Sequence, residues 1–255
     1  MDFYDRLSPF YHLIYQDWEG SIERQAAQLW GVMEREWGGD VKRVLDVACG
    51  IGTQSLGLAG LGLVVKGADV SAGAVARAKR EAAVRGLAIA FEVGDMRTAY
   101  EQHGGGFDVV LAADNAIPHL LSDAEILGAL GQMYRCLRPG GGCVITMRDY
   151  DGAERGRGLV KPYGTREVDG VRYLVWQVWD FEGDIYTVSM YFVRDEGEEG
   201  DVTTEVMRTK YYALSPNRLV SLMVEAGFGE VKRLDDVYFQ PVVVGTRVGD
   251  GSLAS

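Results

Sequence analysis

The sequence has few cysteines and histidines, and their spacing excludes the sites that these residues usually build. Its 255 residues include three cysteines and three histidines. Cys49, Cys136 and Cys143 form no CxxC pair and no cluster with histidine, which argues against a zinc or other metal site. They also provide no disulfide framework, so we expect the protein to work in the reducing cytoplasm.

Long apolar runs and a surplus of basic residues are absent as well. No stretch approaches the roughly 20 apolar residues of a membrane-spanning helix, and residues 1–6 lack the features of a signal peptide. Asp and Glu total 37 against 26 Lys and Arg, which gives a net charge of -11. Because such a surface repels phosphate groups, we expect no nucleic acid and no membrane as a partner.

The composition that is present, 47% hydrophobic and 25% charged, is that of an ordinary globular domain. Apolar strand-like segments alternate with helical ones through the first part of the chain. Strands are predicted at 43–48, 63–70, 88–93, 107–112 and 143–147, and helices at 53–59, 72–85 and 122–137. This alternation is typical of parallel βαβ units. We therefore predict a doubly wound, Rossmann-like α/β fold.

The flanking segments differ in character from this core. Residues 1–20 are rich in aromatic side chains and either pack on the domain or form a lid over a pocket, and 21–37 has helical periodicity. Strand-like segments at 171–181, 185–194 and 202–213 predict an inserted antiparallel β meander, preceded by a loop at 151–170. A helix from 215 to 226 and strands at 231–234 and 237–246 would complete a mostly parallel sheet of seven strands.

We therefore divide the chain into five parts. They are an N-terminal helical or lid segment (1–42), a Rossmann-like core (43–150), the antiparallel insertion forming part of the acceptor site (151–213), a C-terminal helix with the last two strands (214–248) and a flexible tail (249–255).

A glycine-rich turn within the stretch Val44–Thr53 follows the first predicted strand. Gly50 and Gly52 have no Cβ and so allow the backbone to approach a ligand closely. The third glycine of the dinucleotide pattern G-x-G-x-x-G is absent, since Ser55 stands there. Asp46 precedes the turn, and its carboxylate is unfavourable beside a phosphate but suits an ammonium group. The turn thus favours a methionine-like tail, although a purely structural turn remains an alternative.

Acidic residues also follow the next two predicted strands. Asp69 ends the second strand, where a carboxylate can accept hydrogen bonds from a ribose diol. Asp95 follows the third strand and can accept from an adenine amino group while Met96 packs on the ring. Either aspartate alone has a plainer interpretation as a helix-capping residue. Acidic residues at three successive strand ends, however, indicate the crevice where open α/β sheets bind ligands.

On these residues the chain resembles class I S-adenosylmethionine-dependent methyltransferases. The resemblance covers roughly residues 40–150 and rests on Val44–Thr53, Gly67–Ser71, Gly94–Arg97, Phe107–Val110 and Leu137–Gly141. It implies S-adenosylmethionine (SAM) as the cofactor, with Asp69 at the ribose and Asp95 and Met96 at the adenine. It also implies that the rest of the cofactor is contacted by Asp46, Ala48, Gly50, Gly52, Val70 and Ala113.

Two later stretches, Asp114–Leu120 and Thr146–Asp151, are similar to the glycine and glycine/sarcosine N-methyltransferases. This resemblance implies that Asn115 and Arg148 hold an amino-acid acceptor. It further implies that Tyr191 lies near the acceptor and that Arg24 reaches the cofactor's carboxylate.

Plainer interpretations remain open for the acceptor residues. Arg148 could pair with Asp149 or Asp151, Asn115 could be a turn residue, and Tyr191 could be an ordinary strand residue. His119 could be a base, but a structural role beside a proline is the more common one.

We predict a methyltransferase that acts on the nitrogen of a small amino acid such as glycine or sarcosine. A sulfonium donor is already activated, so that alignment of the acceptor supplies much of the catalysis. The alternatives are an O- or C-methyltransferase of a small secondary metabolite, with His119 as base, and a cofactor-binding protein without catalysis. The aromatic N-terminus is compatible with a homo-oligomer, but the sequence leaves the oligomeric state open.

Overall fold

The computed structural model describes residues 3–198 and 200–249, and its core is a seven-stranded sheet in the order β10-β11-β5-β4-β1-β2-β3. The strands are β1 (Arg43–Asp46), β2 (Val64–Asp69), β3 (Ala90–Val93), β4 (Phe107–Ala112), β5 (Leu137–Thr146), β10 (Phe228–Leu234) and β11 (Val242–Arg247). All neighbours are parallel except β11, which runs antiparallel to β5 and β10. The predicted doubly wound fold is confirmed. Of the predicted tail, residues 250–255 lie outside the described residues.

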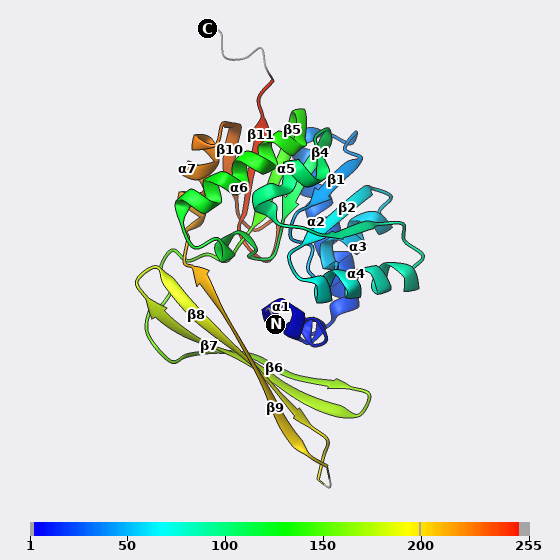
Figure 1. The fold of residues 1–255 in the computed structure, drawn as a ribbon, viewed down its shortest axis with the longest axis vertical. Helices are drawn as coiled ribbons and strands as arrows, with labels where there is room; N and C mark the ends of the chain where they lie inside the picture. Colours follow the sequence, from blue (N-terminus) through cyan, green and yellow to red (C-terminus); the bar gives the residue numbers. More distant parts are fainter. Residues whose placement is uncertain (1–2, 199, 250–255) are drawn as a thin grey trace.

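Helices cover both faces of this sheet (Figure 1). They are α2 (Trp18–Trp37), α3 (Thr53–Gly60), α4 (Ala72–Val84), α5 (Ala99–His103), α6 (Asp123–Cys136) and α7 (Pro216–Glu225). Strand β4 shows why the middle of a buried strand is apolar. Val109 and Leu111 pack in the cluster that holds α2, whereas Val110 and Ala112 pack in the cluster that holds α6 and α7. Residues 109–112 are thus buried on both faces and are all apolar, whereas Asp108, near the start of the strand, pairs with Arg138.

Short polar caps fix where the longer helices begin. Ser71, Ser122 and Ser215 each accept a hydrogen bond from a backbone N–H in the first turn of α4, α6 and α7. Asp17 does the same for α2. These caps satisfy N–H groups that have no partner within the helix.

A separate antiparallel sheet forms the predicted insertion, and it has one more strand than the sequence predicts. Its order is β6 (Leu159–Val168), β7 (Val171–Glu182), β8 (Ile185–Asp195) and β9 (Val202–Tyr212). The prediction of a loop at 151–170 is therefore wrong for β6. Its Gly, Arg and Pro residues conceal the strand pattern, and the strand forms at the sheet edge by pairing with β7, with a bulge between Pro162 and Gly164.

The N-terminal segment lies between the two sheets (Figure 1). It contains α1 (Phe3–Leu7) and the 3-10 helix η1 (Tyr11–Ile14), and two further 3-10 helices, η2 (Met96–Thr98) and η3 (Ile117–His119), follow β3 and β4. Leu7 and Leu13 are buried against Val175, Met190 and Phe192 of the insertion. The segment is thus packed in place by the meander.

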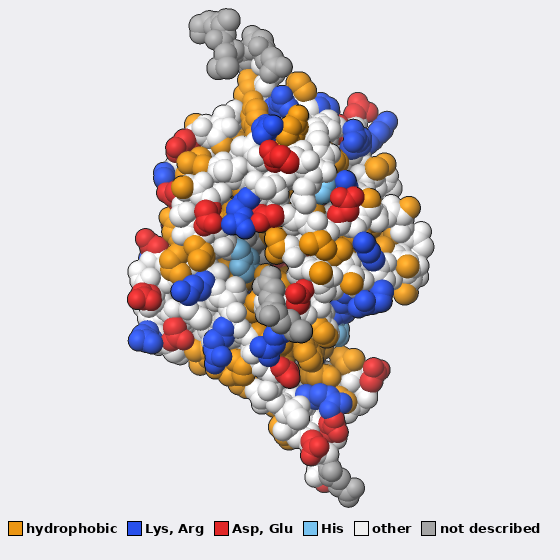
Figure 2. Space-filling view, in the orientation of Figure 1, with side chains coloured by type: hydrophobic (Ala, Val, Ile, Leu, Met, Phe, Trp, Pro, Cys, Tyr) orange, Lys and Arg blue, Asp and Glu red, His pale blue; other side chains and the backbone are white. Residues whose placement is uncertain are grey.

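Acidic and basic side chains are interspersed on the face drawn in Figure 2. Across the described residues many of them form ion pairs, among them Arg218–Asp123 and Arg85–Glu81. Among the helices of residues 3–198 and 200–249, none has both the length and the hydrophobicity needed to cross a bilayer.

Close packing of α2 on α3 depends on Gly57. A Cβ at this position would lie 2.5 Å from the backbone oxygen of Ile22 and 2.6 Å from the Cβ of Ala26. We expect Gly57→Ala to lower the free energy of unfolding by about 1–3 kcal/mol, because two helices must move apart. In α2, a Cβ on the exposed Gly31 would meet no atom within 4 Å. Gly31→Ala should therefore raise the free energy of unfolding by about 0.5–1 kcal/mol. Urea unfolding of both variants measures these changes, and an equal change in the two variants would contradict the role of Gly57 in helix packing.

Candidate active site

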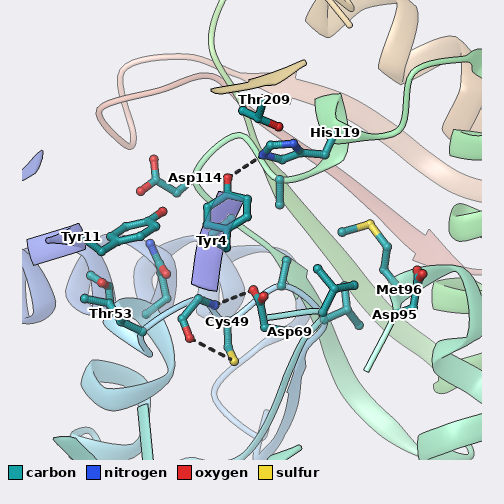
Figure 3. A pocket seen from close by; sticks show the side chains of 18 of the residues that line it. Tyr4, Tyr11, Cys49, Thr53, Asp69, Asp95, Met96, Asp114, His119 and Thr209 are labelled. Atoms are coloured by element: carbon teal, nitrogen blue, oxygen red, sulfur yellow. Dashed lines mark hydrogen bonds between the residues drawn. The ribbon is translucent and has the colours of Figure 1, made fainter. Parts of the chain in front are cut away.

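A cavity of about 230 Å³ opens at the carboxyl ends of the parallel strands. In Figure 3, Met96 and Asp95 lie on one side of it, Tyr11 and Thr53 lie on the other, and Asp69 lies between. The remaining walls come from the loops after β1 and β4 and from the N-terminal segment; among their lining residues are Ala48, Gly50, Ala113, Asp114, His119, Tyr4 and Tyr15. This is the crevice that the sequence predicts.

The glycine-rich turn contributes Gly50 to the cavity but not Gly52. Both adopt left-handed backbone conformations, with φ of 53° and 96°, which explains why glycine stands at each position. A Cβ on Gly50 would meet no atom within 4 Å, so the backbone there is open to a ligand. A Cβ on Gly52 would lie 3.3 Å from Ala78, Leu56 and Phe91. Gly52 therefore serves the packing behind the turn.

Asp46 lies beneath the turn and is outside the lining of the cavity. Its carboxylate is 1% exposed and accepts hydrogen bonds from Ser55 Oγ at 2.7 Å and from the backbone N–H of Ala48 at 3.3 Å. Burial raises its pKa to about 7, and the two hydrogen bonds act against that rise. Asp46 thus holds the shape of the turn from below.

Asp69 and Asp95 both line the cavity and are both held by backbone N–H groups. Asp69 accepts from Gly50 and from Ser71, each at 2.9 Å, and so ties the glycine turn to the end of β2. Asp95 accepts from the N–H of Arg97 at 2.8 Å, and its carboxylate also forms an ion pair with the Arg97 side chain. Val70 and Met96 complete this side of the wall.

Three tyrosines of the N-terminal segment, Tyr4, Tyr11 and Tyr15, also line the cavity. Asp5 fastens the segment to the start of α4, accepting from Ser71 Oγ at 2.7 Å and from the N–H of Gly73 at 2.9 Å. The segment therefore packs on the rest of the protein and also lines the pocket.

Asn115 and Arg148, which follow β4 and β5, lie together as the sequence predicts. The Asn115 side chain accepts a hydrogen bond from the backbone N–H of Arg148 at 3.0 Å and donates one to Tyr150 Oη at 3.0 Å. Asn115 is 2% exposed and has a left-handed φ of 66°. The side chain thus fixes the backbone from which Arg148 projects.

The guanidinium of Arg148 is surrounded by aromatic side chains. It donates to Tyr186 Oη at 3.4 Å and to Tyr163 Oη at 3.3 Å, and it lies 5.3 Å from the ring centre of Trp179. Within the described residues it forms no ion pair with a carboxylate, including those of its sequence neighbours. Those neighbours, Asp149 and Asp151, pair with Arg233 instead. The interpretation of Arg148 as an ion-pair partner of Asp149 or Asp151 is therefore wrong.

Tyr191 and Arg24 are placed differently from the sequence prediction. Side chains alternate along β8, so Tyr186, Met190 and Phe192 are buried, while Tyr191 lies on the opposite face and stacks on Trp176. The tyrosine of β8 that contacts Arg148 is instead Tyr186. The Arg24 side chain is 62% exposed, contacts Asp17 and Ser21, and is outside the cavity lining. The helix-capping Asp17, about two turns away, holds it at the surface.

His119 lines the cavity, but its surroundings make it a weak base. Its Nε2 lies 2.5 Å from Tyr4 Oη, and its ring centre lies 4.1 Å from that of Tyr211. Burial, together with the charge of Arg148, lowers its pKa to about 3. The imidazole is therefore neutral at physiological pH and takes up a proton poorly.

Comparison with known proteins assigns the central segment to a domain type. Residues 44–141 match the family model described as a methyltransferase domain. The glycine/sarcosine N-methyltransferase of Halorhodospira halochloris is 31% identical over 110 residues, or 43% of this chain and 41% of that protein. A ubiquinone biosynthesis O-methyltransferase of Burkholderia vietnamiensis is 33% identical over 100 residues, or 39% of this chain and 41% of that protein. The match thus spans about two fifths of the length of these curated relatives.

Solved structures match over a much larger part of the chain. A sugar N-methyltransferase from Streptoalloteichus has a TM-score of 0.78 at 22% identity, covering 94% of this chain and 93% of that one. An amino pentose methyltransferase from Micromonospora echinaspora, solved with SAM bound, has a TM-score of 0.76 at 20% identity, covering 89% and 92%. At these identities the likeness concerns the fold, and it includes the inserted meander because nearly the whole chain is covered.

The buried carboxylate of Asp46 should make stability depend on pH. Its pKa of about 7 lies above the ordinary value of 3.8, so the folded protein is favoured below about pH 4 and loses this contribution as pH rises through 7. In Asp46→Asn this part of the dependence should vanish. The variant should gain, relative to the parent, on the order of a few kcal/mol between pH 4 and pH 8. Urea unfolding across this range measures the difference, and parallel curves for the two proteins would contradict the assignment.

Proposed function

We propose that this chain, whose residues 44–141 carry a methyltransferase domain, is a SAM-dependent methyltransferase that methylates the nitrogen of a small amino acid such as glycine or sarcosine. The observation that carries the acceptor class is Arg148. Its guanidinium is partly buried, is held by tyrosine hydroxyls, and has no carboxylate partner among the described residues. A carboxylate of the acceptor would supply that partner.

The cavity wall offers carboxylates and an open stretch of backbone, which suit the parts of SAM. We assign the ribose to Asp69, the adenine to Asp95 and Met96, and the methionine part to the backbone around Ala48, Gly50 and Ala113. The open backbone at Gly50 supports this assignment, since a Cβ-free turn is what a closely bound ligand requires. Bound there, SAM supplies a methyl group on an activated sulfonium.

The chain's own contribution is to orient the acceptor and exclude water. Arg148 presents two parallel N–H donors that match a carboxylate, a geometry that lysine does not offer. Its charge acts on Asp114 and His119, two residues of the cavity wall, which supports a carboxylate site next to the proposed cofactor site. Tyr4, Tyr11 and Tyr15 cover the cavity. Positioning of this kind can lower the barrier by up to about 7–11 kcal/mol.

Methylation of a hydroxyl is the alternative, and the state of His119 counts against it. A hydroxyl acceptor needs a base that removes its proton in place. With its pKa lowered to about 3, His119 is poorly suited to that task. An amine can lose its proton more easily, so the nitrogen acceptor fits this site better.

The test of the proposal is methyl transfer from labelled SAM to a panel of amino acids, simple amines and phenols. We expect turnover with amines that carry a carboxylate. Arg148→Lys should raise KM for these acceptors roughly 10- to 100-fold, because a charge-assisted bidentate contact contributes about 1.5–3 kcal/mol. KM for SAM should stay unchanged, and so should both constants in the control Arg172→Lys, an exposed arginine of the insertion. Unchanged acceptor KM in Arg148→Lys, or turnover restricted to phenols, would contradict the proposal.

Removal of one hydroxyl distinguishes the two faces of β8. Tyr186 Oη lies 2.8 Å from Tyr150 Oη and 3.4 Å from Arg148 Nη1, whereas Tyr191 stacks on Trp176 on the opposite face. Tyr186→Phe should raise acceptor KM roughly 2- to 10-fold, as expected for one lost hydrogen bond of about 0.5–1.5 kcal/mol. Tyr191→Phe should leave it unchanged. Steady-state kinetics with the acceptor from the panel decides, and a larger effect at Tyr191 would restore the sequence-based assignment.

A further inference from the structure

We infer that Asp114 is the second anchor of the acceptor site, where its carboxylate binds the acceptor's ammonium group and takes up the proton that the nitrogen must lose. The site would then select a zwitterion, with Arg148 holding one end and Asp114 the other. This inference rests on the proposed function and deepens it, because it names the group that prepares the nitrogen.

The backbone at Asp114 is held in an uncommon conformation that directs the side chain to the cavity. Asp114 and Asn115 follow β4 with left-handed φ values of 57° and 66°, two such residues in succession without a glycine. Such conformations are energetically unfavourable and persist only where neighbouring contacts impose them. Here the N–H of Asp114 donates to Thr146 Oγ1 at 2.8 Å, and that of Asn115 donates to the Thr146 carbonyl at 3.0 Å. The end of β5 thus fixes the turn.

The carboxylate of Asp114 has neutral partners. It accepts from Tyr15 Oη at 2.8 Å and from Gln240 Nε2 at 3.3 Å. Throughout 3–198 and 200–249, no lysine, arginine or histidine forms an ion pair with it. A carboxylate enclosed in this way calls for a cation or a proton. The other enclosed carboxylates differ, because Asp46 lies outside the cavity lining and Asp69 accepts two backbone N–H groups.

Arg148 carries the opposite charge but does not neutralise the Asp114 carboxylate. Arg148 and Asp114 follow neighbouring strands, and the charge of Arg148 acts on Asp114, yet the two form no ion pair within the described chain. Arg148 is occupied by Tyr163 and Tyr186 on its own side. A small molecule with a carboxylate and an ammonium group could span the two side chains, whereas one that lacks either charge would leave an anchor without a partner.

Several groups around Asp114 set its proton affinity. Burial raises its pKa, and the hydrogen bond from Tyr15, the charge of Arg148 and the hydrogen bond from Gln240 act against that rise. The negative charge of Asp114 in turn contributes to the raised pKa of the Tyr11 and Tyr238 phenols. The carboxylate therefore holds a proton more readily than an exposed aspartate and is better matched to an amine.

The proton transfer is balanced without another reactant. The acceptor's N–H bond breaks, its proton moves to the Asp114 carboxylate, and the ammonium becomes a neutral amine with a free lone pair. The nitrogen then forms a bond to the methyl carbon as the carbon–sulfur bond breaks, and that electron pair stays on sulfur. The product leaves as a methylated ammonium, and Asp114 releases its proton to water.

The test compares glycine with glycolate, which replaces the ammonium by a hydroxyl, on enzyme saturated with S-adenosylhomocysteine. Calorimetry should show that the wild type binds glycine more tightly than glycolate. In Asp114→Asn, glycine affinity should fall at least 10-fold, while glycolate affinity stays within about 3-fold. Asn tolerates the left-handed backbone, so the fold should survive. Asp236→Asn is the matched control, since Asp236 is exposed with a left-handed φ of 60°, and it should leave both affinities unchanged.

Two outcomes would overturn the inference while the proposed function stands. One is an equal glycine-to-glycolate ratio in the wild type and in Asp114→Asn. The other is a loss of S-adenosylhomocysteine affinity in Asp114→Asn as large as the loss for glycine, which would assign the carboxylate to the cofactor. If the wild type binds neither probe, the acceptor class of the proposed function is wrong instead. The amine identified by the labelled-SAM panel and its hydroxyl analogue then replace the pair, with the same criterion.

Discussion

The parallel pairing of β4 between β1 and β5 is the constraint on which the site depends. It brings three chain segments to one edge of the sheet, namely the glycine turn after β1, the Asp114–Asn115 pair after β4 and Arg148 after β5. Because both faces of these strands are buried, the strands cannot slide without exposing apolar side chains. The polar residues at their ends are therefore held at fixed positions relative to one another.

Hydrogen bonds across the strand ends hold the polar residues there in a fixed arrangement. Asn115 accepts from the backbone of Arg148, and Asp114 and Asn115 both donate to Thr146 at the end of β5. On the cofactor side, Asp69 joins the glycine turn to the end of β2. The proposed acceptor and cofactor sites thus share one rigid support, and alignment between them needs no movement of the core.

The inserted sheet and the N-terminal segment supply the side chains that enclose the cavity and Arg148. The meander supplies Tyr163, Tyr186 and Trp179 around the Arg148 guanidinium. The N-terminal segment packs on the same meander through Leu7 and Leu13 and contributes tyrosines to the cavity wall. Parts of the chain that are distant in sequence therefore enclose a charged side chain in aromatic surroundings, where an ionic contact is stronger than in water.

The sequence by itself determined the doubly wound fold, the glycine turn and the acidic residues at the strand ends, because apolar periodicity, missing Cβ atoms and strand–helix alternation are local signals. The resemblance of Asp114–Leu120 and Thr146–Asp151 to a known family also pointed to Asn115 and Arg148 as a pair. Only the tertiary structure decided which tyrosine of β8 faces Arg148, because a shift of one residue reverses the face of a strand and the sequence pattern around Tyr186 and Tyr191 is aromatic on both sides. It also decided that Arg24 points to solvent, that β6 is a strand, and that Asp114 lies enclosed without a cation, because burial and partners come from segments far away in the chain.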